Sequence, residues 1–223
     1  MSAEITLSAG NIAILVASLL VAGAVVGFMS GLLGIGGGGI LVPVLYETFA
    51  ALGVDQSIRM HMALATSLAV IVPTSLRSLS AHRAKGSVDL DIVKRLGPWV
   101  IVGVGLGVLT AESGSSTFLK WFWVVVGTVM AAKMWFGRDE WRLGKEIPKS
   151  RWVEVYGVFV GYVSVLISIG GAAFIVGLMT LYGRSVLQAV GTSSGFGPLI
   201  AIPGAIGFMW AGWGVPGTLP LSV

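Results

Sequence analysis

Glycine runs interrupt apolar sequence at two places in this chain, and no other feature limits its fold as strongly. The first run is Gly34-Ile-Gly-Gly-Gly-Gly39, and the second is Ser168-Ile-Gly-Gly-Ala-Ala173. Glycine destabilises helices, and backbone that leaves a helix inside a bilayer must find partners in protein, water or a ligand. Two such breaks in corresponding halves of a membrane protein are typical of a transport site.

The composition is that of a membrane protein. Hydrophobic residues make up 55% of the 223 residues and charged residues 11%, whereas soluble domains carry about 25% charged residues. We therefore predict an all-α fold, a polytopic transmembrane helical bundle with two inverted repeats and glycine-broken helices. The chain has no cysteine and two histidines, which argues against thiol chemistry and a multi-histidine metal site. We expect no catalytic residues, no metal and no cofactor, and so no enzyme.

The apolar segments predict the membrane spans, because about 20 helical residues cross about 30 Å of hydrocarbon. The predicted spans are 11–33, 36–52, 61–80, 96–111, 117–136, 152–169, 171–182 and 187–213. Segments 36–52 and 171–182 are short, and the sequence leaves open whether they cross the membrane or are re-entrant. The predicted organisation is a first repeat in 1–95, connecting spans and a loop in 96–151, and a second repeat in 152–223.

Basic residues are concentrated in two loops. Ten of the 14 Lys and Arg residues lie in 77–95 and 138–151, without the interleaved aromatic residues of a nucleic-acid surface. We expect no nucleic-acid partner and assign both loops to the cytoplasm by the positive-inside rule. The predicted location is the inner (plasma) membrane, multi-pass, with the lipid bilayer as a partner. If 36–52 crosses, the two glycine breaks then have opposite orientations.

The two halves align beyond the glycines. Gly36-Gly37 matches Gly170-Gly171 at an offset of 134 residues, and Ala63 to Ser67 matches Ala189 to Ser193 at an offset of 126. A shorter connection in the second half, 183–186 against 53–60, accounts for the difference. Each half therefore contains a glycine break, a short apolar helix, a turn, and a helix that begins with small residues and a Thr-Ser pair.

This order predicts a binding site for a small anion. Glycines let backbone approach a ligand, and a helix that starts at the break points its positive end toward it. The threonine and serine hydroxyls donate hydrogen bonds without a formal charge. The predicted substrate-binding residues are Gly36, Gly37, Gly38, Gly39, Thr66, Ser67, Gly170, Gly171, Thr192 and Ser193. Glycines in membrane helices also serve close helix packing, and buried hydroxyls often bond the carbonyl one turn back.

Glu47 is the acidic residue that lies well within an apolar segment. Carboxylates inside a membrane are costly and are candidates for function, so Glu47 is the candidate for proton coupling. The alternative is that Glu47 lies near the end of a short helix and reaches interfacial water.

The run Ser30-Gly-Leu-Leu-Gly-Ile-Gly-Gly-Gly-Gly-Ile-Leu-Val-Pro-Val-Leu45, with Ala65-Thr-Ser67 and Ala81-His-Arg-Ala-Lys-Gly-Ser-Val-Asp89, resembles the TauE/SafE sulfite exporter family (DUF81, TSUP). The second repeat is similar to the other half of the family pattern, with Ala172-Ala173 where the family usually keeps a third glycine. The resemblance implies an inner-membrane permease for small sulfur-containing anions. It also implies one or two further apolar spans, so the chain resembles a C-terminally shortened member.

The leading hypothesis is a secondary membrane transporter, an exporter of small sulfur-containing anions such as sulfite or organosulfonates. The alternative is a non-transporting membrane subunit that acts as an assembly or sensory partner. Substrate identity, direction, coupling ion and oligomeric state stay open at this point.

Overall fold

The computed structural model describes residues 23–24, 38–136, 143–144, 146–148, 150–213 and 215, and all regular structure from residue 38 onward in this part is helical. The predicted all-α bundle is therefore confirmed. Span 11–33 lies outside the described residues except for residues 23 and 24. The helices are α2 (Gly38–Ala51), α3 (Gln56–Ala84), α4 (Leu90–Ser113), α5 (Ser116–Phe136), α6 (Arg151–Ile167), α7 (Ala172–Leu181), α8 (Val186–Ser193) and α9 (Phe196–Ala211).

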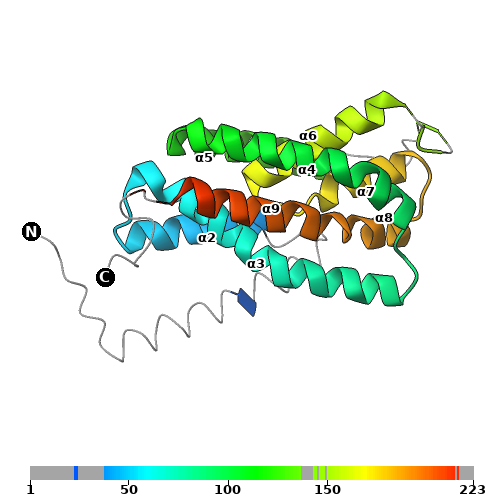
Figure 1. Cartoon of the computed structure of the whole chain (residues 1–223), viewed down its shortest axis with the longest axis horizontal. Coiled ribbons are helices and arrows are strands. Elements are labelled where there is room, and N and C mark those ends of the chain that lie inside the picture. Colours follow the sequence, from blue (N-terminus) through cyan, green and yellow to red (C-terminus); the bar gives the residue numbers. More distant parts are fainter. Residues whose placement is uncertain are drawn as a thin grey trace, which may run out of the picture.

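Three helical segments among the described residues are long and apolar enough to cross a membrane. They are Gln56–Ala84, Leu90–Ser113 and Val186–Ala211, and the last combines α8 and α9. The first two exceed the predicted spans 61–80 and 96–111 at both ends, and the N-caps Asp55 and Asp89 account for the earlier starts. Most of the long helices run roughly along the long axis of the molecule, and α6 slants across it (Figure 1).

Glycines bring α4 and α6 into backbone contact. A Cβ atom at Gly103 of α4 would lie 2.0 Å from the carbonyl oxygen of Val158, and one at Gly161 of α6 would lie 2.0 Å from that of Val100. Such close approach is typical of membrane helices. The hydrophobic effect does not drive helix association in lipid, and small residues allow close van der Waals packing instead. This pair of helices and the α3–α9 pair form the frame of the bundle (Figure 1).

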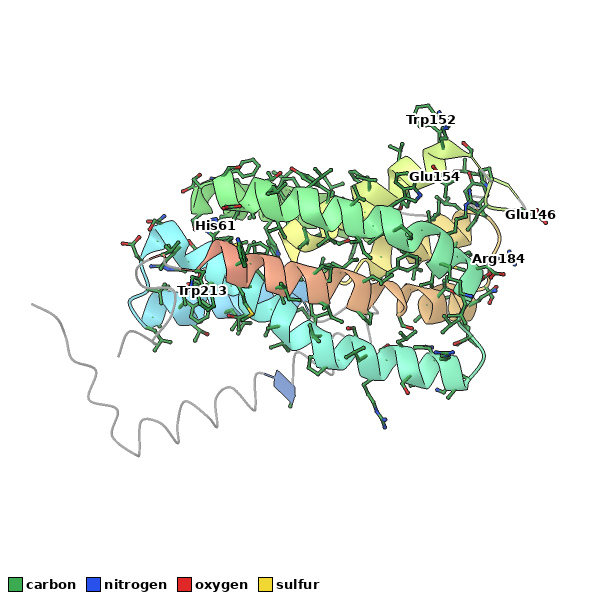
Figure 2. The ribbon with its side chains drawn as sticks, in the orientation of Figure 1. His61, Glu146, Trp152, Glu154, Arg184 and Trp213 are labelled. Carbon is green, nitrogen blue, oxygen red and sulfur yellow. The ribbon has the colours of Figure 1, made fainter. Side chains whose placement is uncertain are left out.

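α2 and α7, the helices that follow the two glycine breaks, point to opposite ends of this frame (Figure 1). We call the two ends the α2 end and the α7 end. At the α2 end, His61 Nε2 lies 2.9 Å from the carbonyl oxygen of Ala111, at the end of α4. At the α7 end, the Leu143 N–H donates to the carbonyl oxygen of Leu181, the last residue of α7, at 2.8 Å. Figure 2 shows His61 and Arg184 at these opposite ends.

α7 turns back toward the end at which α6 begins. The Tyr156 hydroxyl, in the second turn of α6, donates to the carbonyl oxygen of Phe174 near the start of α7 at 2.9 Å. With 10 residues, α7 is about 15 Å long, half of the hydrocarbon thickness. Of the two alternatives left open for segment 171–182, this geometry favours the re-entrant one.

The turns that follow the short helices have the same structure. Gly53 and Gly183 both have a φ of 76°, and both donate to the carbonyl three residues earlier, at 3.1 and 3.0 Å. The next residues, Val54 and Arg184, donate five residues back, to Phe49 and Met179. Each turn is therefore a Schellman motif, followed by a side-chain N-cap, Asp55 or Ser185.

The shorter connection predicted for the second half is wrong, because the two links have equal length. Instead, α2 has 14 residues and α7 has 10. The remaining difference lies in the next helix, where Thr66 comes ten residues after Gln56 and Thr192 six residues after Val186. Each of these two differences is four residues, about one helical turn. The helix faces of the two halves therefore still correspond. The inversion of the halves as a whole stays a prediction.

Candidate functional site

The two glycine breaks meet inside the bundle. Gly38, the first described residue of α2, is buried against the backbone of Ser168, where α6 ends. A Cβ atom at Gly38 would lie 1.4 Å from the carbonyl oxygen of Ser168. No L-amino acid with a side chain fits there without a shift of backbone. We call this contact, together with residues 168–171, the crossing.

Two further helices close the crossing. A Cβ atom added at Gly38 would lie 3.2 Å from the Ile71 side chain of α3, and one added at Gly170 would lie 3.9 Å from the same side chain. A Cβ atom at Gly170 would also lie 3.6 Å from the Cα atom of Gly197, in the first turn of α9. Elements from both halves of the chain therefore meet at this one place.

The backbone of the second break is locally unusual. Ser168 adopts the left-handed conformation, with φ 53° and ψ 42°, which costs a residue with a side chain about 1–2 kcal/mol. Gly171 has a φ of 73° and precedes α7 without a side-chain cap. The start of α7 therefore has uncapped N–H groups and the positive end of a helix dipole beside the crossing.

Two fully buried hydroxyls at the crossing, those of Ser67 and Ser164, have no hydrogen-bond partner among the described residues. Ser67 lies on the face of α3 that also carries Leu64 and Ile71, and the Leu64 carbonyl is 3.5 Å from the Ser168 hydroxyl. The Ser164 hydroxyl is 3.7 Å from the Cβ position of Gly171. Buried polar groups are nearly always hydrogen-bonded in folded proteins. Among the described side chains the third exception is His61 Nδ1 at the α2 end, so two of the three exceptions lie at the crossing.

The structure brings together some of the predicted site residues. Gly38, Ser67, Gly170 and Gly171 gather at the crossing, with Gly39 and Thr66 beside their neighbours Gly38 and Ser67 in α2 and α3. Gly36 and Gly37 lie outside the described residues.

The second Thr-Ser pair lies elsewhere, toward the α7 end. The Thr192 hydroxyl accepts a hydrogen bond from the Asp89 N–H at 2.9 Å, which ties α8 to the α3–α4 link. The Ser193 hydroxyl donates to the Val190 carbonyl within its own helix at 2.8 Å. Both hydroxyls are therefore engaged within the protein, and their role as ligands stays a prediction.

Glu47 is exposed and lies nine residues after Gly38 in α2, about 14 Å along the helix axis. Proton coupling through this carboxylate also stays a prediction.

Sequence reasoning missed Ser164, Ser168 and Gly197 as site residues. The available signal was the spacing of the two serines, which are one turn apart immediately before the second glycine break. Gly197 gave no local signal, because its role depends on the contact between α9 and the break.

The crossing is closed in this conformation. Two open grooves, of about 370 and 440 Å³, lie elsewhere, along Leu76 to Ala84 of α3 and between Trp99 and Arg151. Among the described residues, no cluster of three or more His, Asp or Glu side chains could hold a metal ion.

The family model described as "Sulfite exporter TauE/SafE" matches residues 19–223. The chain belongs to the TauE/SafE sulfite exporter family. The resemblance carried by the glycine motifs is thereby confirmed, and the chain is a membrane transporter by family.

Curated relatives of this TauE/SafE member have consistent names. The chain is 34% identical to a "Probable membrane transporter protein" of Haemophilus influenzae, over 88% of this chain and 75% of the relative. It is 27% identical to "Probable membrane transporter protein MJ0441" of Methanocaldococcus jannaschii, over 86% and 72%. A third relative, "Probable membrane transporter protein YdhB" of Bacillus subtilis, is 26% identical over 84% and 76%. No solved structure matches this chain significantly.

The strained conformation of Ser168 gives a direct test of the site geometry. Ser168→Gly and Ser168→Ala both lose the hydroxyl, but only alanine keeps a Cβ atom in the left-handed region. The glycine variant should therefore be more stable than the alanine variant, by about 1 kcal/mol. Thermal unfolding of both purified variants in detergent measures the difference. An alanine variant that unfolds at the same or a higher temperature would contradict the geometry.

Proposed function

We propose that this protein is a secondary transporter that exports a small sulfur-containing anion, such as sulfite or an organosulfonate. The observation that carries the proposal is the contact of Gly38 with Ser168, which joins both glycine breaks at one uncharged place in the bundle. The family description supports the class of cargo, and backbone breaks at the interface of two repeats are where transporters bind substrate.

The proposed mechanism is alternating access about the crossing. The described part of α2 begins at the crossing and α7 starts beside it, and the two run to opposite ends (Figure 1). The same Schellman turn follows each of them. These features support two repeats of inverted topology. Separation of Gly38 from Ser168 toward one end or the other would then open the site to one side of the membrane at a time.

We further propose that the α7 end faces the cytoplasm and that the membrane is the inner (plasma) membrane. Basic residues lie in the last turn of α3 (Arg83), in the α3–α4 link (Lys85) and at the start of α6 (Arg151) at this end. At the α2 end, the acidic residues Asp55 and Glu112 accompany Arg59 and Lys120. Excess Lys and Arg in short loops marks the cytoplasmic side.

Single cysteines can test this orientation because the chain contains none of its own. Ser113→Cys at the α2 end and Ala84→Cys near the α7 end replace exposed residues. A membrane-impermeant maleimide applied to spheroplasts should label Ser113→Cys and leave Ala84→Cys unlabelled until the membrane is permeabilised. The reverse pattern would contradict the orientation.

Anion flux in proteoliposomes tests the transport proposal. Gly38→Ala should reduce sulfite flux to about a tenth or less, because the contact with Ser168 has no room for a Cβ atom and misplaced binding groups are costly. Gly105→Ala is the matched control, since a Cβ atom there would meet nothing within 4 Å. It should keep wild-type flux. Wild-type flux through Gly38→Ala would refute the role of the crossing.

The same assay tests coupling through Glu47. If this carboxylate carries the coupled proton, Glu47→Gln should abolish the stimulation of flux by a pH gradient while flux down an anion gradient continues. Equal stimulation in wild type and variant would exclude Glu47 as the carrier.

A further inference from the structure

We infer that Ser67 and Ser164, one from each half of the chain, donate hydrogen bonds to the transported anion, and that this anion is taken as a singly charged, sulfonate-like species. The inference rests on the proposed transport function and adds the recognition groups and the charge state of the cargo.

The two hydroxyls differ from the other buried hydroxyls of the described residues. Ser75 donates to the Val72 carbonyl, and Ser193 donates to the Val190 carbonyl. Ser67 and Ser164 are fully buried, and neither has a partner in the part of the chain that the structure describes. An unmade hydrogen bond in a buried place is costly, and a bound ligand that supplies the acceptor removes that cost.

Both serines lie within one helical turn of the place where α3 contacts the end of α6. Leu64 and Ser168 make this contact. Ser67 comes three residues after Leu64, and Ser164 comes four residues before Ser168. The Leu68 and Val165 side chains, adjacent in sequence to the two serines, both lie against Gly204 of α9. An anion between α3, α6 and the start of α7 would have a hydroxyl on either side.

The charge state follows from the sequence around the crossing. Residues 5–46, 60–76, 155–183 and 185–223 contain no Asp, Glu, Lys or Arg. Lys133 of α5 reaches α7, but its Nζ lies against Gly177, more than one turn beyond the break. A dianion would therefore be buried without an adjacent counter-ion, which is far more costly than burying a single charge.

The available donors match a sulfonate group. Hydroxyls and backbone N–H groups donate to anionic oxygens without a formal charge. Ser67, Ser164 and the uncapped first turn of α7 provide such donors at the crossing. Sulfonates carry three acceptor oxygens and one negative charge, and hydrogensulfite has the same oxygen count and charge.

Thermal unfolding of the purified full chain with added anions tests this inference. At constant ionic strength, methanesulfonate, which stays singly charged, should raise the unfolding temperature of the wild type, whereas sulfate, which stays doubly charged, should not. Ser67→Ala and Ser164→Ala should each weaken the apparent affinity for methanesulfonate about tenfold or more. Without anion they should unfold at or above the wild-type temperature, because alanine removes an unpaired polar group.

Two controls accompany these variants. Ser75→Ala, which removes a paired hydroxyl from the same helix, should keep the wild-type response to methanesulfonate. Lys133→Gln should also keep it.

The outcomes separate the inference from the proposed transport function. A full response in both serine variants, or no response of the wild type to methanesulfonate, would overturn the serine assignment. An equal response to sulfate would overturn the charge assignment. Serine-dependent binding without flux in proteoliposomes would support the inference and refute transport.

Discussion

The close approach of two backbone segments inside an apolar bundle is the constraint on which this structure depends. Gly38 contacts the Ser168 carbonyl at a distance that admits no side chain at Gly38. That contact requires α6 to end in the middle of the bundle, and the left-handed Ser168 supplies the end. α7 then starts beside this contact and returns toward the start of α6. The crossing therefore exists because glycine is present on one side and a broken helix on the other.

The same constraint leaves polar groups that the protein itself does not satisfy. A helix that starts at a glycine without a cap exposes N–H groups, and the tight contacts of α3, α6 and α9 hold Ser67 and Ser164 away from any acceptor among the described residues. In a membrane, such groups are expensive unless water or a ligand reaches them. An uncharged set of donors suits a cargo that must be released again, because no strong ion pair has to be broken.

The sequence predicted the helical fold and some of the residues that meet at the crossing, and their role in binding stays a prediction. The glycine runs have a local signature, so Gly38, Gly170 and Gly171 could be found without a structure. The position of Thr192 could not be predicted, because its hydroxyl accepts a hydrogen bond from Asp89, which lies more than a hundred residues earlier in the sequence. Ser164 was missed because serines in membrane helices commonly bond the carbonyl one turn back, and only the fold shows that this one does not. The equal links after α2 and α7 were missed because a whole turn added to a helix leaves its face pattern unchanged.

An experimental structure of the protein with methanesulfonate bound would show whether the crossing holds the anion. We expect density for the anion at the crossing, within hydrogen-bond distance of the Ser67 and Ser164 hydroxyls and close to the start of α7. Gly38 and Ser168 should have moved apart to admit it. Anion density confined to the second Thr-Ser pair or to the basic residues at the α7 end, with Gly38 still against Ser168, would show that the crossing is not the binding site.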